Sequence, residues 1–130
     1  MILYLDTSAV AKLVVDETES EALVAYLEKR KTLGDVLLSS VLLTTELHRM
    51  ATRLGIDHVI VSDVIDQMAI ASADDAFFIT AALLPGSDLR TLDALHLATA
   101  LSVGADEVVT YDHRQMAGAH AVGLRTVSPE

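Results

Sequence analysis

The chain has 130 residues, 52% of them hydrophobic, which is enough for one domain with an apolar core and too few for two. It contains no cysteine, which excludes disulfides and thiolate metal sites and permits a reducing cytoplasm, where we expect the protein to reside. The net charge of −10 disfavours general nucleic-acid binding, because affinity for phosphate ordinarily comes from a basic surface.

Apolar runs alternate with helical periods along the first half of the chain. The pattern predicts strands over residues 2–5 and 36–38, and helices over 8–14, 19–31 and 41–54. Ser39 or Ser40 is expected to cap the helix over 41–54, and Gly55 to end it. Residues 57–84 favour two helices, over 59–67 and 74–84. Residues 68–71 between them are either extended or helical.

The second half continues the alternation after a turn at Pro85-Gly86. A helix over 92–103, with Thr91 as its N-cap, precedes a strand over 107–111, a short helix over 113–119 and a last strand over 124–127. Strands that alternate with helices predict a parallel sheet covered on both faces. We therefore expect one α/β domain over residues 1–130, with a three-layer α/β/α, Rossmann-like architecture.

The N-terminal apolar run is too short for a signal peptide, because Asp6 interrupts it and no basic residue precedes it. No uninterrupted apolar stretch approaches the roughly 18 residues of a membrane span. A soluble protein is expected.

Two carboxylates follow predicted strands. Asp6 ends the apolar run 2–5, and Asp112 ends the run 108–111. Ligands of open α/β sheets bind beyond the carboxyl ends of the strands, so these two acids can share one crevice. A single Asp after a strand is usually a helix cap or a turn residue, and the pair at equivalent strand ends is what favours a shared site.

Two further carboxylates lie on predicted helices with apolar surroundings. Glu46 flanks the apolar stripe of the helix over 41–54, although it could also pair with Arg49 or Arg53 at a boundary position. Asp93 lies in the first turn of an otherwise apolar helix, where backbone N–H groups and the helix dipole keep it ionised. Buried charges are ordinarily paired or bound to metal, so four converging acids indicate a cation site.

Three stretches carry a resemblance to a known family. Tyr4–Ala9, Leu92–Ala100 and Thr110–Arg114 are similar to the signature stretches of the PIN-domain ribonucleases, and within them to the VapC toxins of toxin–antitoxin pairs. Gly123-Leu124 and Pro129 also fit the usual ending of the family. The order and spacing of these stretches cover essentially the whole chain.

The resemblance implies metal-assisted hydrolysis of RNA phosphodiester bonds by Asp6, Glu46, Asp93 and Asp112 with Mg²⁺ or Mn²⁺. Oxygen donors suit these cations on chemical grounds as well. Asp6 and Asp93 are expected to be the main direct ligands, Glu46 to position a water on the metal, and Asp112 to bind or orient a second ion. Many relatives carry another acid or Asn shortly after the fourth carboxylate, and this chain has none before Glu130. The number of bound ions, one or two, is therefore left open.

Other side chains receive supporting roles from the same resemblance. Thr7 or Ser8 is expected to add a hydroxyl behind the ligands. Arg90 and Arg114 flank the acids in sequence and are candidates for binding RNA phosphates, although arginines are mostly exposed in any fold. His96 could hydrogen-bond into the acidic cluster, but a core histidine is favoured.

The resemblance also implies partners. A small antitoxin would occupy the cleft and insert a basic side chain among the acids, and a homodimer is expected because family members commonly dimerise. Phe77 and Phe78 are predicted to belong to the core rather than to a base-stacking surface.

Two other classes of protein remain as alternatives. One is a catalytically silent PIN fold that acts as an interaction module, which the four intact acids disfavour. The other is an acidic phosphoacceptor domain. A receiver domain needs paired acids after its first strand and a late lysine, whereas no lysine follows Lys31. An aspartate-nucleophile phosphatase needs a second Asp where Ser8 stands.

Overall fold

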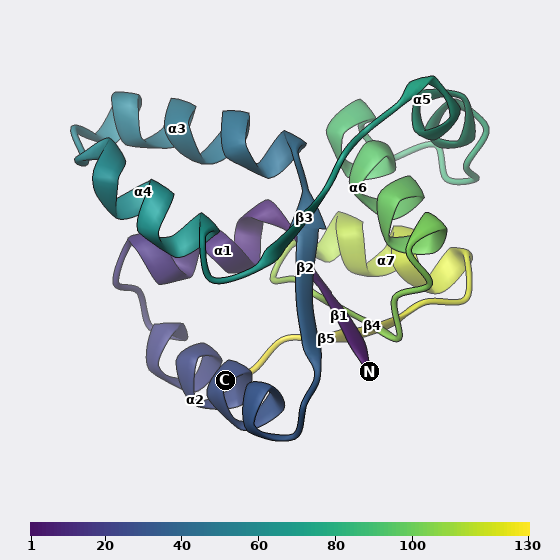
Figure 1. Cartoon of the computed structure of the whole chain (residues 1–130). Coiled ribbons are helices and arrows are strands. Elements are labelled where there is room, and N and C mark those ends of the chain that lie inside the picture. Colours follow the sequence, from purple (N-terminus) through teal and green to yellow (C-terminus); the bar gives the residue numbers. More distant parts are fainter.

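The computed structural model describes residues 1–130 and contains one five-stranded sheet with seven helices around it (Figure 1). In chain order the elements are β1 Ile2–Leu5, α1 Thr7–Val14, α2 Ser20–Thr32, β2 Val36–Ser40, α3 Leu42–Leu54, α4 His58–Ile65, β3 Ala69–Ala71, α5 Asp75–Ala82, α6 Thr91–Ser102, β4 Glu107–Val109, α7 His113–Ala121 and β5 Arg125–Val127. All strand pairs are parallel, in the order β3-β2-β1-β4-β5. The α/β fold predicted from the sequence is confirmed.

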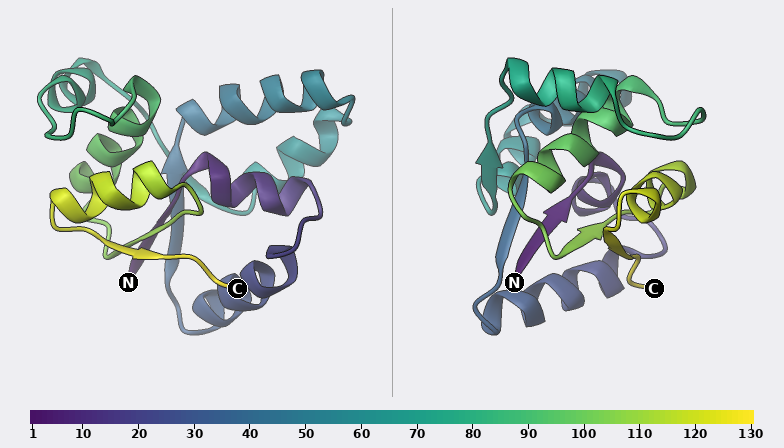
Figure 2. Two further views of the ribbon diagram at one scale, coloured as in Figure 1. Left: turned by 180° about the vertical axis from the view of Figure 1, so that it is seen from behind. Right: turned by 90° about the vertical axis from the view of Figure 1, so that its right-hand side faces the viewer.

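The order of the strands fixes which helices cover which face. From β1 the chain adds β2 and β3 on one side, and later adds β4 and β5 on the other. Right-handed crossovers then place α1–α4 on one face of the sheet and α5–α7 on the opposite face, as the left view in Figure 2 shows. The direction reverses between β1 and β4, and a ligand crevice is expected at the carboxyl ends of these two strands.

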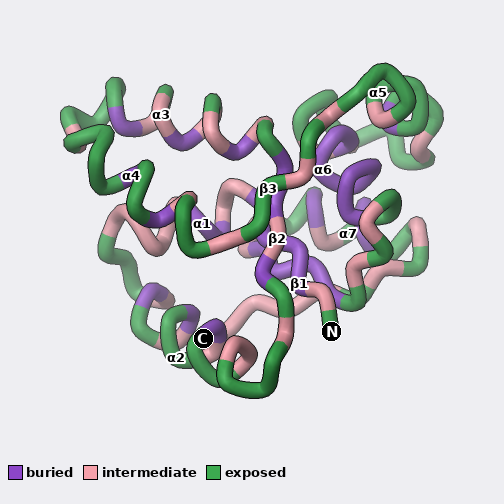
Figure 3. The backbone as a smooth tube through the Cα atoms, viewed as in Figure 1, coloured by how far each residue is buried: buried purple, intermediate pink, exposed green.

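The main core lies between the sheet and the α1–α4 layer. Leu5, Val10, Leu43 and Leu47 are fully buried there, and each such side chain contributes about 1.5–3 kcal/mol to folding. On the other face α6 is buried from Ala94 to Ala100, which Figure 3 shows as a purple helix. The strands and helices that carry the four acids are therefore anchored in packed structure.

Two of the predicted helix caps differ in the structure. The N-cap of α3 is Val41 and not one of the two predicted serines, although Ser40 accepts the Leu42 N–H at 3.2 Å. Ser39 does not cap this helix, because its hydroxyl donates to the Leu5 carbonyl at 2.6 Å and ties β2 to β1. The prediction of Thr91 as the N-cap of α6 was wrong. Thr91 is the first helical residue and Arg90 is the N-cap, and the Asp93 carboxylate accepts the Arg90 N–H at 3.4 Å.

The segment 68–71, predicted to be either extended or helical, contains an edge strand. Ala69–Ala71 pairs with β2, so the extended alternative is correct. Phe78 is 50% exposed, and its assignment to the core was wrong. The short helix α5 packs mainly against α6, so its outer face is uncovered, as the green colour of α5 in Figure 3 shows. No helix combines the length and the apolar character needed to cross a bilayer.

Candidate functional site

Asp6 is the most buried of the four acids, with 4% of its surface exposed. It follows β1 directly and is the N-cap of α1. Its Oδ1 atom accepts the Ala9 N–H at 3.0 Å and the Ser8 hydroxyl at 2.7 Å, and its Oδ2 atom accepts the Thr110 hydroxyl. Asp6 is thus a helix cap, which was one of the two roles considered from the sequence, and its carboxylate is also buried away from solvent.

The environment of Asp6 acts on its ionisation in two opposing ways. Burial raises the pKa of the carboxyl above its ordinary value, while the donors from Thr110, Ser8 and Ala9 lower it. Burial is the larger effect, so the ionised carboxylate is held at a cost in free energy. A positive charge placed beside Asp6 would offset that cost.

Thr110 connects Asp6 to Asp112. Leu5 pairs with Val109 in the sheet, so the residues that follow β1 and β4 lie side by side. The Thr110 hydroxyl donates to Asp6 and accepts the Asp112 N–H at 3.1 Å. Asp112 in turn caps α7, where its Oδ1 atom accepts the Arg114 N–H at 2.8 Å. The two acids at equivalent strand ends therefore meet in one hydrogen-bonded network.

Arg114 joins Asp112 to Asp93. Its Nη2 atom lies 3.7 Å from Asp112 Oδ2 and its Nε atom 3.9 Å from Asp93 Oδ2, and the side chain is 41% exposed. Behind these groups the buried Gln115 donates to the Asp93 carbonyl at 3.4 Å. The Gln115 Oε1 atom has no hydrogen-bond partner, which is a rare state for a buried oxygen.

Glu46 approaches from α3 and is held by a histidine. Its Oε1 atom accepts from His96 Nε2 at 2.6 Å, and it forms no ion pair with Arg49 or Arg53. These two arginines instead line a groove of about 510 Å³ beside Glu46, together with Thr7. His96 is buried, as expected, and it also reaches the acidic cluster.

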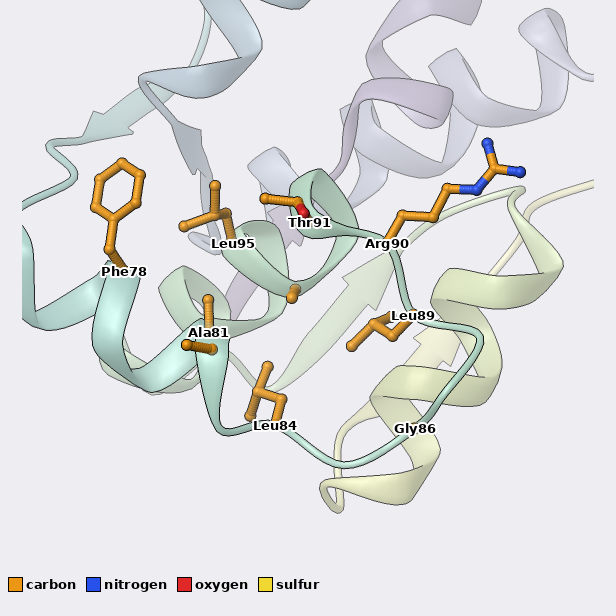
Figure 4. A pocket seen from close by; sticks show the side chains of 10 residues that line it. Phe78, Ala81, Leu84, Gly86, Leu89, Arg90, Thr91 and Leu95 are labelled. Carbon is orange, nitrogen blue, oxygen red and sulfur yellow. The ribbon is translucent and has the colours of Figure 1, made fainter.

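Arg90 lies at the edge of a second, largely apolar groove. This groove of about 360 Å³ is lined by Phe78, Leu84, Leu89 and Leu95, among others (Figure 4). In Figure 4 the Arg90 side chain extends away from the apolar side chains, and it forms no ion pair with an acid of the chain. Arg90 is therefore exposed and free to meet an anion, whereas Arg114 is already paired.

A family model for the PIN domain matches residues 3–120. The chain belongs to the PIN-domain family. Its sequence relatives include Ribonuclease VapC35 of Mycobacterium tuberculosis (strain CDC 1551 / Oshkosh), which is 36% identical over 133 residues. The matched region covers 98% of this chain and 97% of that relative, so this PIN domain stands among the VapC proteins over its whole length.

Solved structures share the fold of this PIN domain at lower identity. The crystal structure of Mycobacterium tuberculosis VapC20, a sarcin–ricin loop cleaving toxin, aligns with a TM-score of 0.76 at 17% identity over 98% of this chain and 99% of that one. VapBC2 from Rickettsia felis, bound to a DNA fragment from its promoter, aligns with a TM-score of 0.74 at 14% identity over 100% of both chains. These likenesses establish the three-layer architecture.

The donor set of the PIN domain fits a hard divalent cation in kind. It consists of carboxylate oxygens with an unpartnered amide oxygen at Gln115 behind them, and Mg²⁺ and Mn²⁺ take such oxygen ligands. The four acids do not form a ready-made coordination site, because no three acidic or imidazole groups lie close enough to share an ion. Glu46 is turned to His96, and Arg114 lies between Asp93 and Asp112. Arg114 would have to move away from Asp93 and Asp112 for these acids to share a cation.

Several residues of this network were not predicted from the sequence as site residues. Thr110 and Gln115 carry no charge, and only the sheet register and the turn into α7 bring them to the acids. Tyr4 was part of a signature stretch, but nothing in the sequence indicates its bond to His96. The one sequence signal that could have indicated them is their spacing from Asp112: Thr110 stands two positions before this acid and Gln115 three positions after it.

Arg114→Ala is expected to strengthen Mn²⁺ binding and to weaken RNA binding. An exposed ion pair contributes about 0.2–1 kcal/mol, so removing this competing charge should tighten Mn²⁺ binding roughly 1.4- to fivefold. Because the sequence predicts that Arg114 binds an RNA phosphate, its loss is also expected to raise KM for RNA. Isothermal titration with Mn²⁺ and steady-state cleavage measure the two effects, with exposed Arg125→Ala as the control. Weaker Mn²⁺ binding in Arg114→Ala would contradict the assigned role.

Proposed function

We propose that this PIN-domain protein is a Mg²⁺- or Mn²⁺-dependent endoribonuclease and the toxin of a toxin–antitoxin pair. The observation that carries the proposal is the hydrogen-bonded meeting of buried Asp6 with Asp112 at the point where the strand order reverses. The near full-length relatives named ribonuclease VapC support the same function.

In the proposed mechanism Asp6 and Asp93 hold the cation. Glu46 orients a water toward the scissile phosphate, and Asp112 binds or orients a second ion. The cation, when bound, supplies positive charge for the phosphate and makes a water more acidic. Ser8 keeps Asp6 in place by donating to its carboxylate at 2.7 Å. The hydroxyl of Thr7 lies 3.2 Å from His96 Nε2, behind Glu46.

The arginines around the acids are proposed to bind the RNA backbone. Arg90 and Arg114 are placed to contact phosphates next to the scissile bond. Arg49 and Arg53 line the groove beside Glu46 and extend this positive edge along α3. The net charge of the chain is −10, and these four arginines would supply positive charge at the surface where the RNA would lie.

Partners and location are proposed on the same basis. A cognate antitoxin would cover the cleft and place a basic side chain among the acids, and the likeness to VapBC2 supports the existence of such a partner. The exposed side chains of Phe78 and Ile79 on α5, and of Leu83 directly after it, support a homodimer, since large apolar surface is commonly an interface. The protein would act in the cytoplasm, where its RNA substrate is found.

Removal of divalent metal is expected to stop RNA cleavage. Purified wild type should cut structured RNA in Mg²⁺ or Mn²⁺ and lose this activity in EDTA, because the proposed mechanism needs the cation to make the attacking water more acidic. Asp93→Asn should fall by at least about a hundredfold, since it removes a proposed direct ligand.

The matched control is Asp63→Asn, which alters an exposed helical aspartate away from the site. It should cut at the wild-type rate. Cleavage that survives EDTA, or that is equal in Asp93→Asn and wild type, would refute the proposed site. A folded wild type that cuts none of several RNAs would favour the interaction-module alternative.

A further inference from the structure

A chain of two short hydrogen bonds runs from the sheet to Glu46. The Tyr4 hydroxyl lies 2.6 Å from His96 Nδ1, and His96 Nε2 lies 2.6 Å from Glu46 Oε1. Tyr4 is fully buried and His96 is nearly so, while Glu46 stands at the boundary with solvent. The imidazole therefore connects a buried strand to one acid of the site.

The donors and acceptors of this chain form one consistent set. Ionised Glu46 only accepts hydrogen bonds, so Nε2 must carry a hydrogen. Burial raises the pKa of Tyr4, so its phenol keeps the O–H. With a neutral imidazole, Tyr4 then donates to the bare Nδ1 atom, and Nε2–H donates to Glu46. Both nitrogens of the imidazole then have a hydrogen-bond partner, which fixes the plane of the ring.

His96 also stands where the elements that carry three acids meet. It follows Asp93 by one helical turn on α6, and its partner Tyr4 lies on β1, two residues before Asp6. Its other partner, Glu46, comes from α3 in the opposite helical layer. The bond occupies Oε1 of Glu46, and the Oε2 atom makes no hydrogen bond to the protein.

We propose that His96 is a positioning residue that sets the orientation of Glu46 relative to Asp6 and Asp93. By holding Oε1 it directs the remaining oxygen of Glu46 toward the cation site, and Tyr4 fixes the imidazole that does so. The inference rests on the proposed function, because the cation site gives the orientation its purpose. Groups behind metal ligands affect affinity and rate in this way in other metal sites.

Four variants separate the bonds of this chain. His96→Leu removes both bonds, and Tyr4→Phe removes only the one to Nδ1. His96→Gln keeps an N–H near the position of Nε2 and should act as the rescuing substitution. His120→Gln is the control, because that exposed histidine contacts only Thr126 on β5.

The first readout is Mn²⁺ affinity, measured by electron paramagnetic resonance without RNA. His96→Leu should weaken it about 10- to 100-fold and lower kcat at saturating Mn²⁺, with KM for RNA nearly unchanged. Tyr4→Phe should weaken it several-fold, and His96→Gln should lie close to wild type. The second readout is the ¹⁵N spectrum of His96, which should show the Nε2–H tautomer in wild type and a mixture in Tyr4→Phe.

The outcomes distinguish this inference from the function on which it rests. If wild type binds Mn²⁺ and cuts RNA while folded His96→Leu and Tyr4→Phe match it, the positioning role is wrong and the nuclease stands. An Nδ1–H tautomer in wild type would also overturn the role. If wild type neither binds Mn²⁺ nor cuts RNA, the proposed function fails and the inference fails with it.

Discussion

Asp6→Asn is expected to eliminate RNA cleavage while making the folded chain more stable. The carboxylate is a proposed direct ligand of the cation, and its loss should reduce the rate by at least about a hundredfold. The same carboxylate is buried at a cost, which the neutral amide does not carry. Opposite effects on activity and stability are characteristic of a residue kept for function.

The hydrogen-bond network around position 6 can accommodate the amide. The Asn oxygen would accept from Ala9 N–H and the Ser8 hydroxyl, as Asp6 Oδ1 does now. The Asn amino group would donate to Thr110 Oγ1, whose own hydrogen can turn to Ser8 Oγ at 3.2 Å. No buried group loses its partner, so the variant should fold normally.

The stability difference should depend on pH with a defined sign. Burial raises the pKa of Asp6 in the folded chain above its ordinary value of 3.8. Between these two pKa values the folded state binds more proton than the unfolded state, so the stability of wild type falls as pH rises. The advantage of Asp6→Asn should therefore be absent below the ordinary pKa, grow through this window and be complete above the folded pKa.

Thermal unfolding in EDTA across this pH range, together with RNA cleavage in Mn²⁺, measures both effects. Asp57→Asn is the matched control, since Asp57 caps α4 in the same way but is exposed. It should show neither the gain in stability nor the loss of cleavage. A less stable Asp6→Asn at neutral pH would contradict the cost assigned to the buried charge.

Thr110→Val is expected to lower the free energy of unfolding by about 1–3 kcal/mol at neutral pH. Valine keeps the branched shape but removes the hydroxyl that donates to Asp6 and accepts the Asp112 N–H. The buried carboxylate then loses a donor, and its pKa rises further. The destabilisation should shrink at low pH, where Asp6 is protonated and needs this donor less.

Chemical denaturation of Thr110→Val at neutral and at acid pH tests this expectation. Thr126→Val is the control on the neighbouring strand, because its hydroxyl contacts only the exposed His120. That change should stay within about 0.5 kcal/mol. Equal destabilisation in the two variants, or no dependence on pH, would mean that Thr110 does not support the Asp6 carboxylate.

The fold was predictable because its signals are local. Alternating apolar runs and helical periods define the strands and most helices, and the order of elements implies a parallel sheet. The uncertain segment contained Ala69–Ala71, an edge strand of three residues with little burial, which leaves no periodic pattern to detect. Phe78 was misassigned because its large apolar side chain stands on a helix face that nothing covers.

The four acids of the proposed site were predicted from the sequence, and the hydrogen bonds that connect them were not. Asp6 and Asp112 each follow an apolar run, and the end of such a run marks the end of a strand. The bonds of Thr110 and Gln115 depend on the register of β1 with β4 and on the start of α7. The bond from His96 to Glu46 crosses between helical layers, and no spacing in the sequence encodes such a contact.

Anomalous X-ray diffraction from crystals soaked in MnCl₂ tests the central claim most directly. The account predicts a manganese peak bonded to carboxylate oxygens of both Asp6 and Asp93, at about 2.1 Å, with Arg114 displaced from Asp93. It also predicts that this peak disappears in Asp6→Asn crystals. No peak at these acids, or binding only at a distant pair such as His48 and His58, would contradict a cation site at the strand ends.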